Sequence, residues 1–289
     1  MSSKIGIIGG SGFYDMEGVK NIRKVKVTTP FGKPSDDFTV GRLEGVDVVF
    51  LARHGKGHSI LPSEINYRAN IYGMKKLGVD RMISISACGS LREDMRPLDI
   101  VVPDQYVDRT NQARRMTFFG DGIVGHVAFS EPVCGALSKE LYEAGRSLGI
   151  PMHLGGTYIN MEGPQFSTKA ESEMYRSWGM DIIAMSNMAE AKLAREAEIC
   201  FATLACVTDY DCWHSHESVE SVSVDLIIQN LKKNVNNAKK IIRGVLKNIK
   251  EDKDCGCHSA LKGAILTDPN VIPEATKKML KLIIGKYIK

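Results

Sequence analysis

The chain has 289 residues, of which 43% are hydrophobic and 25% are charged, and this balance excludes a disordered protein. Its apolar runs reach about ten residues, whereas a membrane helix needs roughly 20, so we expect no membrane span. The formal net charge of +4 comes from scattered Lys and Arg, and we expect no nucleic-acid partner. The N-terminus lacks the pattern of a secretory signal, so we expect a cytoplasmic protein.

Apolar runs and helical spacing alternate along the chain. Strand-like runs occupy residues 4–10, 46–52, 81–87, 99–107, 156–161, 181–186 and 199–207. Helical patterns occupy residues 63–78, 134–149, 168–179, 188–198, 222–249 and 273–288. Thr168 and Glu171 have the spacing of a capping box, and Gly78 and Gly149 are placed to end helices.

Strands that alternate with helices predict an α/β sandwich around a largely parallel or mixed sheet. No linker, change of composition or internal repeat divides the sequence, so we expect one domain over residues 1–289. In open α/β sheets, ligands bind beyond the carboxyl ends of the strands. The residues that directly follow the apolar runs are therefore the first candidates for a site.

The first strand runs into a glycine-rich loop, "GIIGGSGFY". The spacing of Gly6, Gly9, Gly10 and Gly12 does not match G-x-G-x-x-G, which argues against a dinucleotide-dependent dehydrogenase. Backbone N–H groups and the Ser11 hydroxyl in such a loop can surround an anion. The alternative is a plain tight turn.

Other strand ends supply further groups suited to phosphate. Arg53 and His54 follow the second strand, where Arg53 offers a bidentate fork and His54 a further donor. Ser86 and Ser186 add hydroxyls at the ends of later strand-like runs. Taken alone, an Arg-His pair is typical of a surface loop. Together with the glycine-rich loop and the two serine hydroxyls, however, the pair predicts a phosphate pocket without lysine or metal.

An acidic pair, Asp209 and Asp211, follows the last apolar run in "TDYDCW". In an extended segment, residues i and i+2 point to the same side, so both carboxylates could reach one ligand. If phosphate is itself the nucleophile, cleavage of a glycosidic bond needs a proton for the leaving group. Burial would raise the pKa of Asp209, which could hold that proton, while Asp211 could accept from the 6-amino group of adenine. The alternative is a helix N-cap or a surface carboxylate pair.

Together with "TTPFGKPSD", "LPSEINYRANI", "EGPQFSTKAES" and "AKLAREAEICFA", these motifs make nearly the whole chain similar to the trimeric purine nucleoside phosphorylase family, and within it to members that cleave S-methyl-5′-thioadenosine. The resemblance implies a three-layer α/β/α sandwich around a twisted mixed sheet. It also implies phosphorolysis to adenine and 5-methylthioribose 1-phosphate. The expected assembly is a homotrimer or a dimer of trimers, with phosphate as co-substrate and no metal or organic cofactor.

The resemblance assigns roles to individual residues. The phosphate positions match Ser11, Arg53, His54, Ser86 and Ser186. The base and ribose positions match Ala87, Phe166 and Met185. Asp209 matches the residue at purine N7 and Asp211 the one that reads the 6-amino group. The 5′-methylthio pocket matches Val224, Ile227 and Ile228, whose spacing would otherwise indicate ordinary helix core. His126 matches a residue that reaches into a neighbouring subunit's pocket.

The chain departs from the family pattern at several positions. Ser11 and Ser186 replace Thr and keep the hydroxyl, whereas Gln165 replaces Arg and loses any ion pair made there. The segment "SNMAE" replaces a Thr or Gly and a Pro, and "HSHESVESVSVD" contains extra residues that could alter a lid over the 5′ pocket. Three other functions remain open: a 6-oxopurine phosphorylase, a phosphorylase that also accepts adenosine, and a nucleoside sensor without catalysis.

The sequence contains seven cysteines, and five of them are expected to be buried thiols of a reducing compartment: Cys88, Cys134, Cys200, Cys206 and Cys212. Cys255 and Cys257 stand apart in "CGCH". No second pair with finger-like spacing accompanies them, which disfavours a zinc site. Two alternatives are a strained disulfide, as in the oxidised C-x-C of heat-tolerant archaeal relatives, and two free thiols at a helix start.

Overall fold

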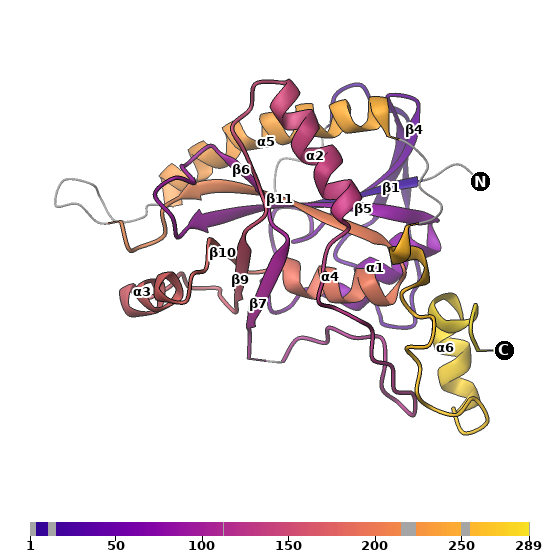
Figure 1. Ribbon diagram of the computed structural model, residues 1–289. Coiled ribbons are helices and arrows are strands. Elements are labelled where there is room, and N and C mark those ends of the chain that lie inside the picture. Colours follow the sequence, from indigo (N-terminus) through magenta and orange to yellow (C-terminus); the bar gives the residue numbers. More distant parts are fainter. Residues whose placement is uncertain (1–3, 11–15, 112, 215–223, 250–254, 289) are drawn as a thin grey trace.

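An 11-stranded mixed sheet forms the middle of the computed structural model (Figure 1). The structure describes residues 4–10, 16–111, 113–214, 224–249 and 255–288. In chain order the strands are β1 (Lys4–Gly9), β2 (Lys20–Val25), β3 (Phe38–Leu43), β4 (Val46–Ala52), β5 (Val79–Ser90), β6 (Ile100–Val102), β7 (Gln105–Arg109), β8 (Met152–Leu154), β9 (Thr157–Met161), β10 (Ile182–Ala184) and β11 (Cys200–Asp209).

The strands at the centre of the sheet run parallel. β1 pairs in parallel with β4 and β5, and β11 pairs in parallel with β5. Their carboxyl ends therefore meet at one edge, where ligands bind in open α/β sheets. β10 runs antiparallel to β5, with Ile183 opposite Gly89. That register brings the chain after β10 back alongside the carboxyl-terminal part of β5.

Helices cover both faces of the sheet (Figure 1). α2 (Gly135–Ser147) and α5 (Val224–Asn248) lie on one face, and α1 (Tyr67–Lys76) and α4 (Asn187–Glu196) lie on the other. α3 (Lys169–Ser177), η1 (Gly256–Ser259) and α6 (Glu274–Ile284) complete the described helices. Successive residues of β5 divide between the layers, because Ile83 packs with α2 and α5 and Met82 with α1 and α4. The predicted three-layer α/β/α architecture is confirmed.

The predicted helix ends agree with the structure. Thr168 and Glu171 form a complete capping box at the start of α3. Gly78 and Gly149 follow α1 and α2 with φ of 85° and 69°, a backbone conformation that side chains disfavour. Within the described part of the chain, every helix lacks the length and apolarity that crossing a membrane requires.

Several strands were not predicted. Residues of β2 are mostly exposed, so this edge strand leaves no apolar run in the sequence, and β3 and β8 were missed as well. The run at 99–107 is two strands rather than one: β6 pairs with β11 and β8, while β7 pairs with β9. Pro103 lies between them and has no N–H for a continuous ladder.

Candidate active site

Arg53, the residue after β4, is 1% exposed and lies beneath the edge where the parallel strands end. Its backbone N–H donates to Gly9 O at 2.9 Å, which joins the ends of β4 and β1. Its Nε and Nη2 donate to the two carboxylate oxygens of Glu190 at 2.5 and 3.0 Å. The expected open fork toward phosphate is therefore wrong for this structure, because Glu190 occupies it. Nη1 donates to Ile85 O at 2.9 Å and keeps one further hydrogen for a ligand.

Glu190 was not among the sequence candidates. It is fully buried on α4, and its Oε2 also accepts from Ser84 Oγ at 2.6 Å. Asn187 Nδ2 donates to the same Ser84 oxygen at 2.6 Å. An acidic residue on the sheet-facing side of an apolar helix is the signal that could have revealed this network, because a buried carboxylate needs a cation or hydrogen bonds.

His54 lies beside Arg53 and is held by its own loop. Its Nδ1 donates to Ile60 O at 2.9 Å, and its ring stacks on His58 with centroids 4.2 Å apart. Burial, with the positive charge of Arg53, lowers the pKa of His54 to about 4. At neutral pH the ring is uncharged, and Nε2 is an acceptor rather than the expected donor. It could therefore pair with a protonated phosphate oxygen.

Two serine hydroxyls flank this region. Ser86 Oγ on β5 is buried and has no hydrogen-bond partner among the described residues. Ser186 is 5% exposed at the N-cap of α4, yet its side chain makes no capping bond. A buried hydroxyl without a partner costs free energy, so Ser86 is suited to pairing with a ligand. Ser11 lies outside the described residues.

The acidic pair lies at the carboxyl end of β11. Asp209 is its last residue, opposite Gly89 of β5, and burial raises the pKa of its carboxyl. Its Oδ1 accepts the backbone N–H of Asp211 at 2.8 Å. Asp211 is 8% exposed with φ of 51°, so the chain turns here and the expected extended geometry is wrong. Burial also raises the pKa of Asp211.

Gly89 leaves room for both carboxylates. A Cβ added there would lie 3.1 Å from Asp209 Oδ1 and 3.3 Å from Asp211 Cβ. Any larger residue on this part of β5 would press on the acidic pair.

α5 and the end of β11 are joined by hydrogen bonds that were not predicted. Asn230 Nδ2 donates to Thr208 O, and Asn234 Nδ2 donates to Val207 O, each at 2.8 Å. Thr208 Oγ1 lies 2.7 Å from Asp209 Oδ2 and 3.2 Å from Cys88 O. The position of Asp209 therefore depends on both β5 and α5.

The nucleoside candidates lie on segments around these groups. Met185 directly follows β10, and its carbonyl accepts from Arg114 Nη1. Arg114 also pairs with Glu162, with Nε 3.1 Å from Oε1, and so joins the "MEGPQF" segment to Met185. Arg114 is a second buried residue that the sequence reasoning missed. Ala87 is half-buried on β5 next to Ser86.

Other nucleoside candidates are more open. Phe166 is 51% exposed and Ile228 43% exposed, while Ile227 is half-buried on α5. Val224 begins α5, but its side chain and residues 215–223 of the expected lid lie outside the described part. His126 is exposed and its backbone N–H donates to Ala264 O at 2.8 Å, so it belongs to a segment paired with the C-terminal region.

A separate surface hollow contains none of these candidates. It is lined by residues that include Asp99, Arg146 and His153. His153 Nε2 lies 2.7 Å from Asp99 Oδ2, so the polar groups there pair with each other. The strand-end region remains the candidate active site.

Comparison with known proteins agrees with this fold. Residues 4–247 match the family described as the phosphorylase superfamily, and the chain belongs to that family. The S-methyl-5′-thioadenosine phosphorylase of Geobacter sulfurreducens is 58% identical over 288 residues, covering 100% of both chains. The protein of the same name from Thermosynechococcus vestitus is 55% identical, again over 100% of both.

Solved structures of phosphorylases have the same fold as this chain. A methylthioadenosine phosphorylase from an antarctic soil metagenomic library has a TM-score of 0.92 and 49% identity, covering 98% of this chain and 99% of that one. The methylthioadenosine phosphorylase of Schistosoma mansoni in complex with adenine has a TM-score of 0.84 and 38% identity, covering 91% and 97%.

Proposed function

We propose that the protein cleaves S-methyl-5′-thioadenosine with phosphate, giving adenine and 5-methylthioribose 1-phosphate. The observation that carries this proposal is the buried Asp209–Asp211 turn, which lies on the same strand pair as the unpartnered Ser86 hydroxyl. Phosphorolysis needs a proton donor for the leaving base and a binding site for the attacking phosphate. The names of relatives at 55–58% identity over the full chain support the choice of nucleoside.

In the proposed reaction, phosphate binds at the carboxyl ends of β1, β4 and β5. Its ligands are Ser11, Arg53, His54, Ser86 and Ser186. Because Glu190 balances the charge of Arg53, the remaining Nη1 hydrogen and the hydroxyls do most of the binding. Neutral His54 accepts from a protonated phosphate oxygen, which orients an unprotonated oxygen toward the sugar.

The chemical step transfers the sugar from nitrogen to oxygen. A phosphate oxygen forms a bond to the anomeric carbon as the bond from that carbon to purine N9 breaks, and the electron pair goes to the purine. Asp209 delivers a proton to N7, which neutralises the leaving base. Its raised pKa, caused by burial, favours the protonated form that this role requires. Asp211 accepts from the 6-amino group and so selects adenine.

The nucleoside is held by Ala87, Phe166, Met185, Val224, Ile227 and Ile228, with His126 supplied to a neighbouring subunit. The exposure of Phe166 and Ile228 is consistent with side chains that await a ligand or a second subunit. We therefore propose a homotrimer, alone or as a dimer of trimers. Residues 1–289 would act as one domain, in the cytoplasm, with phosphate as co-substrate and no cofactor in the reaction.

Base release tests this function directly. Methylthioadenosine, adenosine, methylthioinosine and inosine are each incubated with and without phosphate, and the free base is measured. We expect phosphate-dependent adenine release that is fastest from methylthioadenosine. Faster hypoxanthine release would instead establish a 6-oxopurine phosphorylase, and binding without release would establish a sensor.

A further inference from the structure

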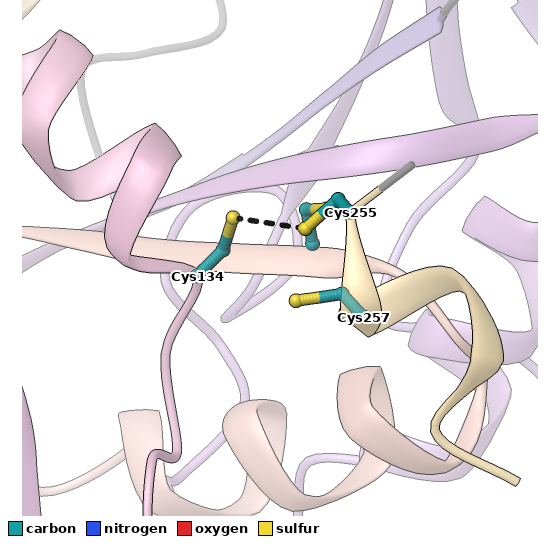
Figure 2. A group of neighbouring side chains, drawn as sticks. Cys134, Cys255 and Cys257 are labelled. Carbon is teal, nitrogen blue, oxygen red and sulfur yellow. Dashed lines mark hydrogen bonds between the residues drawn. The ribbon is translucent and has the colours of Figure 1, made fainter. Parts of the chain in front are cut away.

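Four of the seven cysteines meet at one point in the fold (Figure 2). They come from three separate segments: Cys134 precedes α2, Cys200 begins β11, and Cys255 and Cys257 lie at the start of η1. Their sulfur atoms all lie within 4.8 Å of one another. In Figure 2 the side chains of Cys134, Cys255 and Cys257 converge from the α2 end and from η1.

The sulfur separations match a metal tetrahedron. Cys134 Sγ lies 3.8 Å from Cys255 Sγ, and Cys200 Sγ lies 3.5 Å from the same atom. Four sulfurs placed about 2.3 Å from a zinc ion form a tetrahedron with edges of about 3.8 Å. A disulfide needs a separation of about 2.05 Å. All seven cysteines are free thiols in this structure, which therefore agrees with the free-thiol alternative for Cys255 and Cys257 rather than with the disulfide.

We propose that Cys134, Cys200, Cys255 and Cys257 bind one zinc ion. Four thiolates suit zinc, which prefers tetrahedral sulfur and nitrogen ligands. Since the four cysteines fill the tetrahedron, no position is left for water or substrate, and the site is structural rather than catalytic.

The surroundings favour a metal–thiolate cluster. Cys134 is the N-cap residue of α2, where the positive end of the helix dipole stabilises a thiolate. His258 lies against the cluster, with Nε2 3.7 Å from Cys200 Sγ, while its Nδ1 lies 3.3 Å from Glu198 O. Cys134 and Cys200 are 4% and 1% exposed, while Cys255 and Cys257 are half-buried, so the cluster is shielded from water on the side of the sheet.

The zinc ion would fasten the C-terminal segment to the sheet. The segment after Cys255 contains η1 and α6, and Leu261 and Ile283 within it pack in the same core cluster as α1 and α4. Cys200 begins β11 and Asp209 ends it, so about 30 Å of strand separates the metal from the acidic pair. We therefore expect zinc removal to lower thermal stability and to leave base release possible at low temperature.

A zinc site at these four cysteines differs from the sequence-based expectation, and the difference has a physical reason. That expectation rested on the lack of a second cysteine pair with the sequence spacing of zinc fingers. Here the fold supplies the second pair as two single cysteines, one before a helix and one at the start of a strand, which are brought together only by the packing of α2 on β11.

The test uses protein purified without immobilised metal or added zinc. We expect one zinc per chain by elemental analysis, and seven reactive thiols after unfolding with a chelator. Replacement of zinc by Co²⁺ should give the intense visible d–d bands and near-ultraviolet sulfur-to-cobalt charge transfer of a tetrahedral tetrathiolate. Protein without zinc that also fails to give this cobalt spectrum would overturn the proposal. A thiol count of three would then show two disulfides instead.

Variants separate the cluster from other cysteines. Cys257→Ser and Cys134→Ser should reduce bound zinc to below about a tenth of an ion per chain. Cys206→Ala is the matched control, because Cys206 lies on the same strand as Cys200, is also 1% exposed and is outside the cluster. It should keep one zinc. Equal zinc loss in the control would contradict the assignment. If a ligand variant does not fold, the cobalt spectrum of the unmodified chain decides whether the four thiolates bind a metal.

Discussion

Asp209 Oδ1 accepts the backbone N–H of Asp211 at 2.8 Å, so one acidic residue is oriented by the main chain of the other. Asp211 has φ of 51°, and the turn it makes places both residues against Gly89. The second Asp209 oxygen lies 2.7 Å from Thr208 Oγ1. These contacts fix the carboxyl group that we propose as the proton donor.

The pH dependence of turnover should report the protonation of Asp209. Because burial raises its pKa, the protonated form persists to higher pH than for an exposed aspartate. We expect kcat to fall as pH rises through that raised pKa. Asp209→Asn should lower kcat by about 100-fold or more and remove this basic limb. If kcat of the variant still fell over the same pH range, that pH dependence would belong to a titrating group other than Asp209.

The strand ends could be predicted because an apolar run marks where a strand lies, and the first polar residues after the run mark its carboxyl end. Asp209 and Arg53 were located in this way, whereas Ser86 lies inside β5, which continues to Ser90. The partner of Arg53 could not be found, since Glu190 is 137 residues away in the chain and meets it only when α4 packs on the sheet. The turn after Asp209 was missed for a local reason, because Asp211 adopts positive φ without being a glycine.

The Arg53–Glu190 pair should be essential for stability. Both side chains are buried, so Glu190→Gln leaves an uncompensated guanidinium and should cost about 3–5 kcal/mol of unfolding free energy. Urea unfolding of the purified variant measures the loss. Glu274→Gln is the control, because Glu274 forms an exposed pair with Lys277 that should contribute at most about 1 kcal/mol. Equal effects of the two variants would rule out a special role for the buried pair.

His54 should make stability depend on pH in phosphate-free buffer. Its folded pKa of about 4 lies below the value of 6.5 expected in the unfolded chain. As pH falls below 6.5, the unfolded chain takes up a proton on His54 before the folded chain does. The folded state is therefore most stable relative to the unfolded chain above pH 6.5, and it loses unfolding free energy as pH falls from 6.5 toward 4.

Urea unfolding at two pH values measures this effect. Between about pH 6.5 and 5, the native chain should lose about 1–2 kcal/mol more unfolding free energy than His54→Asn. Parallel curves for the two proteins would mean that His54 has an ordinary pKa.

Gly89 should be intolerant of a side chain for catalytic reasons. A Cβ there would lie 3.1 Å from both Asp209 Oδ1 and Ile183 Cγ2, so Gly89→Ala should displace the acid. We expect kcat to fall by about 10- to 100-fold, because small displacements of catalytic groups are costly. Gly244→Ala on α5 is the control, since its Cβ would meet only ordinary contacts at 3.5 Å or more. Steady-state kinetics of both variants provide the comparison.

The most direct test of the proton-donor role compares two substrates in Asp209→Ala. One is methylthioadenosine, and the other is its N7-methylated form, whose base already carries the positive charge that protonation would supply. The alanine variant also leaves space for the methyl group. We predict that the variant loses about 100-fold or more in turnover of methylthioadenosine but stays within about tenfold of the native chain on the N7-methylated substrate. An equal loss on both substrates would show that Asp209 does not deliver the proton to N7.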